Sequence, residues 1–135
     1  LYPQVSFWIR GRLQAWVWYE RAAHQGHAVA QAVLGNRYMR GVDTVANVCE
    51  AERWYLLAAE QGNLPAITNL GMIYENHWRD YSEALKWYKL ADEKGQLGAH
   101  LMVARVSDLL TFYPEGPDDI ADQSSSEGSE RDCGL

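Results

Sequence analysis

Three Trp-Tyr pairs recur along the chain at nearly equal intervals. The pairs are Trp18-Tyr19, Trp54-Tyr55 and Trp87-Tyr88, which lie 36 and then 33 residues apart. Only 6 of the 135 residues are Trp, so this register is too regular to be accidental. A period of this length is typical of an array of small structural repeats, in which each repeat buries its apolar face against its neighbours.

Small residues accompany each Trp in the same register. An alanine stands three positions before it and four and twelve positions after it, and a glycine stands eight positions after it. The alanines are Ala15, Ala22, Ala30, Ala51, Ala58, Ala66, Ala84, Ala91 and Ala99, and the glycines are Gly26, Gly62 and Gly95. The first two repeats also share a Leu-Gly pair followed by a tyrosine, namely Leu34, Gly35, Tyr38, Leu70, Gly71 and Tyr74. The third repeat has Val103, Ala104 and Ser107 instead.

The spacing within each repeat predicts two helices. Ala-x-x-Trp-Tyr follows the i, i+3, i+4 spacing of one helical face, and the third alanine, the Leu and the Tyr (Ala30, Leu34 and Tyr38 in the first case) step by four along another helix. The glycine between them can adopt positive φ and end the first helix. Asp80 and Glu83 have capping-box spacing, and Asn63 with Pro65 is typical of a helix start. We expect helices over 12–25, 27–40, 47–61, 64–76, 81–94 and 97–112.

This pattern resembles the Sel1-like repeat family, which is related to tetratricopeptide repeats, over about residues 12–110. The residues that match one unit are Ala30, Gln31, Leu34, Gly35, Tyr38, Gly41, Ala51, Trp54, Tyr55, Ala58, Ala59 and Gly62. Those that match the next are Ala66, Leu70, Gly71, Tyr74, Asp80, Ala84, Trp87, Tyr88, Ala91 and Gly95. The resemblance implies an all-α fold, an α/α superhelix (solenoid) of about three helical hairpins, and its matching residues are structural.

The chain divides into three predicted parts. Residues 12–113 form the repeat array, and residues 1–11 are expected to be the remnant of a preceding helix. Either a larger parent array or a partner that covers Trp8 and Trp16 is expected at this end. Residues 114–135 form an acidic, Ser-rich tail that is expected to be disordered. The loop after Tyr38 departs from the family pattern, because Asp43 and Thr44 stand where Gly and Val are usual.

The charge of the chain is concentrated in the tail. Of 18 acids and 12 bases, seven acids and one base lie in residues 114–135, which leaves 11 of each in residues 1–113. A neutral body lacks the basic surface that attracts phosphate backbones, so nucleic acid is not an expected partner. No apolar run is long enough to span a membrane. The first residue is not Met, so the chain is expected to be a processed form or an excerpt.

A search for chemistry finds no catalytic motif, and we expect no enzyme activity, cofactor or metal. His24 and His27 are three residues apart but flank a predicted helix end, so a solvated helix junction is favoured over metal binding. Cys49 stands near a helix start, and an ordinary buried or half-buried side chain is favoured over a reactive thiol. A second cysteine, Cys133, lies in the tail. Glu50, Glu52, Glu60 and Glu75 have the intervals of exposed helix faces.

By resemblance to tetratricopeptide arrays, the helices that carry the Leu-Gly pairs would line a concave surface. Amide, guanidinium and thioether groups there suit an extended peptide, through backbone hydrogen bonds, carboxylate pairing and adaptable apolar contact. The alternative is an ordinary solvated face. The candidate partner-binding residues are Asn36, Met39, Arg40, Thr68, Met72, Glu75, Asn76 and Arg105.

The predicted function is a non-enzymatic adaptor or scaffold that binds a protein or peptide. The alternatives are a dedicated inhibitor or immunity protein for one toxin or enzyme, and a weak hydrolase. The compartment is left open by the sequence; we expect a bacterial protein, and a bacterial origin would place it in the cytoplasm or the periplasm. In the tail, Ser124 and Ser129 each have an acid three residues later, which suits acidophilic kinases, while a solvated terminus is the simpler interpretation.

Overall fold

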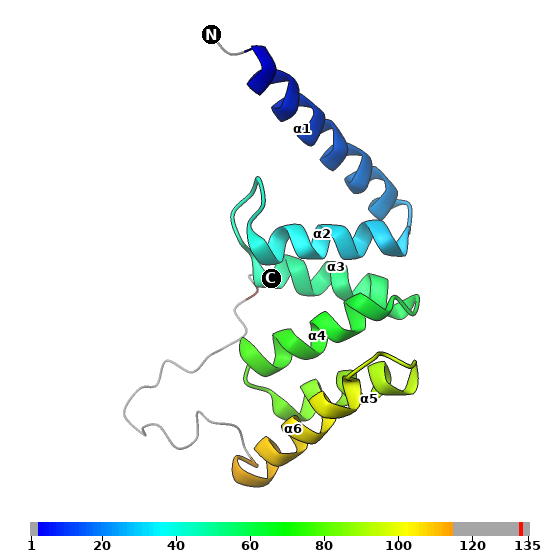
Figure 1. Ribbon diagram of the computed structural model, residues 1–135, viewed down its shortest axis with the longest axis vertical. Coiled ribbons are helices and arrows are strands. Elements are labelled where there is room, and N and C mark those ends of the chain that lie inside the picture. Colours follow the sequence, from blue (N-terminus) through cyan, green and yellow to red (C-terminus); the bar gives the residue numbers. More distant parts are fainter. Residues whose placement is uncertain (1–2, 115–132, 134–135) are drawn as a thin grey trace, which may run out of the picture. The chain divides into compact units, whose positions relative to one another are not determined.

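The computed structural model describes residues 3–114 and residue 133, and all regular structure in these residues is helical. The chain forms two compact units, residues 1–63 and 64–135. Figure 1 shows the helices in chain order. They are α1 (Pro3–His24), α2 (Ala28–Arg40), α3 (Val48–Glu60), α4 (Leu64–Asn76), α5 (Tyr81–Glu93) and α6 (Ala99–Phe112).

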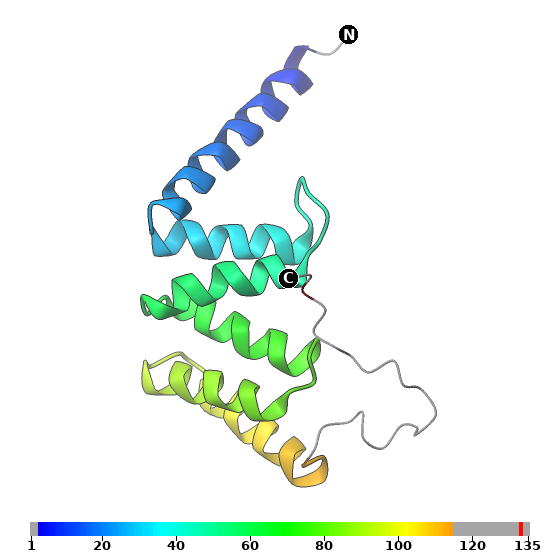
Figure 2. The same cartoon turned by 180° about the vertical axis from the view of Figure 1, so that it is seen from behind.

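The first unit contains α1, α2 and α3. Helix α2 packs against both of the others, and its contact with α3 is the more extensive. The C-terminal part of α1 meets α2, while the N-terminal part extends away from α2 in both views (Figures 1 and 2). A small apolar core of Ala23, Ala30 and Leu34 lies where the three helices meet, with Trp16 and Trp54 packed against it.

The second unit contains α4, α5 and α6. Helix α5 packs against both α4 and α6. The alanines of the repeat pattern, Ala66, Ala84, Ala91 and Ala99, are completely buried. Because an alanine side chain is a single methyl group, the helix backbones can approach closely at these positions.

Glycines at positive φ form the predicted ends of the Trp-Tyr helices. Gly26, Gly62 and Gly95 have φ values of 92°, 82° and 84°. Helix starts are also as expected, because Asp80 accepts a hydrogen bond from the Glu83 backbone N–H at 3.0 Å. Asn47 caps α3 in the same way, through the Glu50 N–H at 3.1 Å.

The predicted helices are confirmed, with one difference at the N-terminus. Residues 3–11 were expected to belong to a separate, preceding helix, but α1 continues without a break from Pro3 to His24. Gly11 lies between the two expected segments, and one glycine lowers helix stability without ending the helix. Residues 1–2, 115–132 and 134–135 lie outside the described part of the chain, so the predicted tail is not tested.

Candidate functional site

Tyr55 of α3 lies directly on the backbone of Gly35 in α2. A Cβ atom at Gly35 would overlap the Tyr55 ring, which is only 1% exposed. The Tyr55 hydroxyl donates a 2.6 Å hydrogen bond to the side-chain oxygen of Asn36. The Leu-Gly and Trp-Tyr pairs of the first unit therefore form one contact, in which glycine provides the space for the ring.

The second unit repeats this contact. A Cβ atom at Gly71 would lie 2.5 Å from the Tyr88 ring. The Tyr88 hydroxyl donates a 2.7 Å hydrogen bond to Glu75, and Arg105 donates to the same carboxylate oxygen at 2.7 Å. Glu75 is on α4, Tyr88 on α5 and Arg105 on α6, so one carboxylate connects all three helices of the unit.

The burial of Tyr88 affects its ionisation. Its ring is fully buried, which raises the pKa of its hydroxyl well above the ordinary tyrosine value, and the hydrogen bond to Glu75 and the charge of Glu75 raise it further. The hydrogen bond to Glu75 likewise raises the pKa of Arg105. Both groups are therefore held in their protonated forms around a negative carboxylate.

The predicted binding residues of the first unit lie near the C-terminal half of α2. Asn36 and Met39 are half-buried, and Arg40 is exposed. Asn36 is the acceptor for Tyr55, so its side chain contributes to helix packing as well as to the surface. Arg40 is thus the most accessible member of this group.

In the second unit, α4 and α6 carry the remaining candidates. Met72 is 44% exposed, Asn76 is exposed, and the half-buried Thr68 donates to the carbonyl of Leu64 at 3.2 Å. The Arg105 side chain is 56% exposed although it is anchored on Glu75. Glu75 itself is buried, so it supports Arg105 and offers little surface of its own.

The prediction that four glutamates occupy exposed helix faces is wrong for two of them. Glu52 and Glu75 are buried, whereas Glu60 is exposed and Glu50 pairs with Arg53 at the surface at 2.8 Å. Helical spacing does not distinguish a carboxylate that faces solvent from one that meets a buried hydroxyl on another helix. The positions of Tyr88 and Arg105 on two other helices explain why the Glu75 carboxylate is buried.

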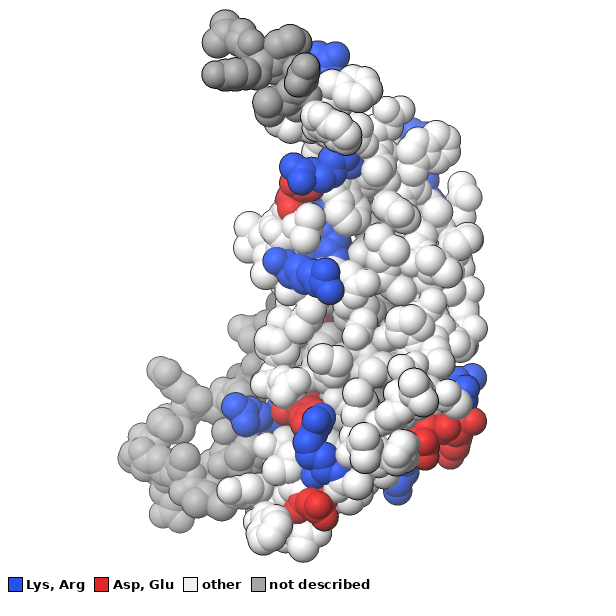
Figure 3. Space-filling model, viewed as in Figure 1, with Lys and Arg blue, Asp and Glu red and all other residues white. Residues whose placement is uncertain are grey.

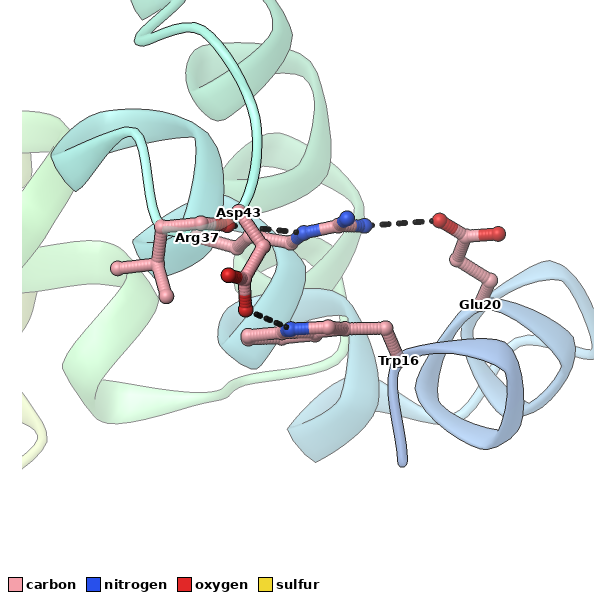
Figure 4. Close-up of polar contacts among 5 residues, drawn as sticks. Trp16, Glu20, Arg37 and Asp43 are labelled. Atoms are coloured by element: carbon pink, nitrogen blue, oxygen red, sulfur yellow. Dashed lines mark hydrogen bonds and ion pairs between the residues drawn. The ribbon is translucent and has the colours of Figure 1, made fainter. Parts of the chain in front are cut away.

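A polar cluster that the sequence did not predict joins α1 to α2. The Arg37 guanidinium lies over the Trp16 ring, 4.6 Å from its centroid, and donates to Glu20 at 2.9 Å and to the Val42 carbonyl at 3.2 Å (Figure 4). Its side chain is only 11% exposed. Trp16 is therefore covered by Arg37, within the chain.

The loop that follows α2 completes this cluster. Asp43 accepts a 3.0 Å hydrogen bond from Trp16 Nε1 and forms a 3.1 Å ion pair with Arg12. Its φ of 56° lies in the left-handed region that favours glycine. Asp43 thus adopts a conformation that favours glycine, at a position where the resemblance leads us to expect Gly, and its carboxylate attaches the loop to α1.

The histidines and Cys49 have structural contacts. His27 caps α2, since its Nδ1 accepts from the Ala30 N–H at 3.4 Å, and His24 packs edge-on against Trp54. Cys49 is half-buried, as expected, but it is disulfide-bonded, as is Cys133. The disulfide leaves Cys49 without a free thiol, so the reactive-thiol alternative raised from the sequence does not apply to the disulfide-bonded protein.

A hollow of about 410 Å³ lies beside the His24–Trp54 contact in the first unit. Its lining residues are Ala23, His24, Gly26, Gln31, Glu50, Arg53, Trp54 and Leu57. The side chain of Gln31 is committed to the Ala23 carbonyl, at 3.1 Å, and to Gln61, at 2.9 Å. Gln31 thus joins the C-terminal ends of α1 and α3 at this hollow.

On the face shown in Figure 3, the charged side chains of the described residues lie in small groups, several of them of mixed sign, and uncharged surface separates these groups. This face does not provide the continuous positive potential that nucleic-acid binding requires. None of the helices in residues 3–114 has an apolar stretch of membrane-spanning length.

The Tyr-on-Gly contact and its recurrence agree with a family model. The Sel1 repeat model matches residues 11–27, 28–63 and 64–95. The chain belongs to the Sel1 repeat family. The resemblance inferred from the Trp-Tyr and Leu-Gly pairs is therefore confirmed, as is the all-α fold class of helical-hairpin repeats, the α/α solenoid. Two of the matched repeats are complete hairpins, whereas residues 11–27 contain only a Trp-Tyr helix.

Two solved bacterial structures are similar to this Sel1 repeat chain. One is c5321, a protective antigen of uropathogenic Escherichia coli with an SLR fold, at 32% identity and a TM-score of 0.65, covering 74% of this chain and 22% of that one. The other is a Sel1 repeat protein from Oxalobacter formigenes, at 36% identity and a TM-score of 0.62. The match covers 75% of this chain and 40% of that one. This chain therefore spans less than half of either protein. No curated protein matches it.

Sel1 repeat proteins generally mediate protein–protein interactions and are generally not catalytic. The coarse prediction of an interaction module is therefore supported at the level of the family.

Proposed function

We propose that this Sel1 repeat chain is a non-enzymatic adaptor that binds an extended segment of another protein through α4 and α6 of its second unit, and that α2 of the first unit offers a separate surface of the same kind. The observation that carries the proposal is the anchoring of Arg105. Its guanidinium is held in place by the buried Glu75, while more than half of its side chain stays exposed. A fixed and accessible guanidinium is well suited to a carboxylate, because less conformational entropy is lost on binding.

Apolar and polar groups accompany this guanidinium. Met72 on α4 exposes a flexible thioether that adapts to different apolar side chains. Asn76 on the same helix is exposed and can pair with a peptide backbone. The ligand that fits this chemistry is an extended peptide segment with an apolar residue and an acidic residue. Arg40 and Met39 provide a similar combination in the first unit.

The test starts from affinity capture with the full chain, followed by mass spectrometry of the retained proteins. The affinity of each retained protein is then measured for the wild type and for the Met72→Asp and Arg40→Glu variants, which change exposed side chains outside the core. Lys89→Glu on α5 is the matched control, since it also reverses an exposed charge but lies on a Trp-Tyr helix. We expect at least a tenfold loss of affinity in the first two variants and no change in the control.

The same measurements separate the alternatives. Equal affinity in all variants would remove these helices as the binding surface. One tight stoichiometric partner whose own activity is blocked would identify the dedicated inhibitor instead of a general adaptor. A hydrolase screen compares the wild type with the Met72→Asp variant. Hydrolase activity that persists through repeated purification of the protein would contradict the non-enzymatic assignment.

A further inference from the structure

The tail of this chain contains a short segment with the chemistry that suits the ligand proposed above. Residues 118–122 have the sequence Asp-Asp-Ile-Ala-Asp, so one large apolar side chain, Ile120, has acids on both sides. Ile120 is the only Leu, Ile, Val or Met in residues 113–132, and these residues carry seven acids and one base. We call residues 118–122 the acidic segment.

The surface that fits this segment lies on α4 and α6. Arg105 is held by the buried Glu75 at 2.7 Å, while 56% of its side chain stays exposed. Met72 is 44% exposed and stands three positions before Glu75, so both project on the same side of α4. A fixed guanidinium and a flexible thioether therefore share one side of the second unit.

Exposed apolar side chains extend this surface along α6. Leu101 and Phe112 are 65% and 76% exposed, and they stand four residues before and seven residues after Arg105, on the same face of the helix. Asp108 is also exposed on α6. Because like charges repel, an acidic ligand is favoured at Arg105 and disfavoured nearer the end of the helix.

The chain changes direction directly after α6. Helix α6 ends at Phe112, and Tyr113 has non-helical backbone angles, φ −129° and ψ 70°. The residue before a proline is disfavoured in the helical region, and Pro114 stands in a turn. Gly116 and Pro117, two further residues typical of turns, precede the acidic segment.

The acidic segment is within reach of Arg105 in the same molecule. Arg105 stands seven residues before Phe112, about 10 Å along the helix axis. The eight residues from Phe112 to Ile120 span up to about 28 Å when extended. The far end of the tail is not free either, since Cys133 is disulfide-bonded.

We propose that the acidic segment binds this surface of its own chain, with Ile120 against Met72 and an aspartate on Arg105, and thereby competes with the protein partner. The inference rests on the proposed function, because it gives the same surface an occupant from within the chain. The later acids of the tail, Glu127, Glu130 and Asp132, have no large apolar side chain among them, so they match the surface less well.

Attachment to α6 makes even a weak contact effective. A segment joined through a short flexible linker is present at an effective concentration on the order of 1 mM. With an intrinsic Kd of about 0.1 mM, the segment lowers the affinity for a partner by about tenfold. A partner that binds more tightly still displaces it, so the tail sets a threshold for binding.

Two variants of the full chain with equal charge test this assignment. The segment variant carries Asp118→Asn, Asp119→Asn and Asp122→Asn, and the control variant carries Glu127→Gln, Glu130→Gln and Asp132→Asn. Each loses three negative charges from the tail and leaves α1 to α6 unaltered. Both are kept under non-reducing conditions, so that the disulfide stays intact.

The first measurement uses NMR of the methionine methyl groups and needs no partner. The chain has three methionines, of which Met39 in the first unit is the internal reference. We expect the Met72 signal to move in the segment variant and to keep its wild-type position in the control variant. Equal Met72 signals in the wild type and the segment variant would overturn the proposal. So would a difference that disappears on dilution, because the segment would then bind a second copy.

The second measurement supplies the segment as a separate synthetic peptide of residues 114–124. By calorimetry, we expect this peptide to bind the segment variant with a Kd of about 0.1 mM and the wild type about tenfold more weakly, because the attached segment occupies the surface. Adding Met72→Asp to the segment variant should abolish binding. Equal affinity for the wild type and the segment variant would contradict occupation by the chain's own tail.

The inference and the proposed function fail in different ways. Any captured partner should bind the segment variant about tenfold more tightly than the wild type and the control variant. A changed Met72 signal with equal partner affinities would overturn the competition and place the partner on another surface. An unchanged Met72 signal would overturn the tail contact, while the loss of partner affinity in Met72→Asp would still test the proposed function.

Discussion

The Tyr88 ring rests on the backbone of Gly71, and no side-chain atom of residue 71 separates them. The same relationship holds between Tyr55 and Gly35 in the other unit. It explains why a Leu-Gly pair and a Trp-Tyr pair recur together in the sequence. Each glycine is the site at which a large ring from the next helix can approach the helix axis.

Gly71→Ala is therefore expected to destabilise the protein by about 2 kcal/mol, because the added methyl group forces a fully buried ring to move. Gly11→Ala in α1 is the matched control, since nothing lies within 4 Å of its Cβ position, and it should stabilise the helix by about 0.5–1 kcal/mol. Urea unfolding of the full chain measures both. A destabilised Gly11→Ala, or a neutral Gly71→Ala, would contradict this account of the repeat.

Tyr88 predicts how stability depends on alkaline pH. Burial and the Glu75 carboxylate raise the pKa of Tyr88 in the folded state, so the folded protein holds this proton more tightly than the unfolded chain. The stability that this proton contributes is fully present below a pH of about 10, the ordinary pKa of tyrosine. It is lost as the pH rises from there through the raised pKa of the folded state.

Tyr88→Phe removes this pH dependence together with the hydrogen bond to Glu75. The variant should lose about 1–2 kcal/mol of stability at pH 7, because a buried carboxylate loses a donor. Its stability should then fall less steeply than that of the wild type between pH 9 and 12. Urea midpoints across this range measure the slope, and parallel curves for the two proteins would show that Tyr88 does not contribute.

Arg37 should be among the most sensitive charged residues of the first unit. Arg37→Ala removes contacts to Trp16, Glu20 and the Val42 carbonyl, and a loss of about 2–3 kcal/mol is expected because the guanidinium is almost completely buried. Arg37→Lys should recover only part of it, since an ammonium group cannot reproduce the planar stacking and the divergent hydrogen bonds.

Arg53→Ala is the comparison for Arg37. Arg53 pairs with Glu50 at a similar distance, 2.8 Å, but its side chain is 72% exposed. Its removal should therefore change stability by less than about 0.5 kcal/mol. Similar losses at both positions, measured by urea unfolding, would show that burial of Arg37 does not determine its contribution.

Asp43 separates the effect of backbone conformation from that of side-chain contacts. Asp43→Ala loses the bonds to Trp16 and Arg12 and also places an alanine at positive φ, so we expect a loss of about 1–2 kcal/mol. Asp43→Gly loses the same bonds but tolerates the backbone conformation, so it should be less destabilised by about 1 kcal/mol. Thermal unfolding of both variants gives the comparison, and an Asp43→Gly variant less stable than Asp43→Ala would refute it.

The sequence by itself determined the helices, the turns and the family. Glycines such as Gly62 and caps such as Asp80 act over a few residues, and the Trp-Tyr period marks which faces pair, so these features can be inferred without coordinates. The tertiary structure decided the rest, namely that Glu75 is buried, that Arg37 covers Trp16 and that Trp18 is exposed. Each of these depends on which side chain of a distant helix lies opposite, and the spacing along one helix carries no information about that neighbour.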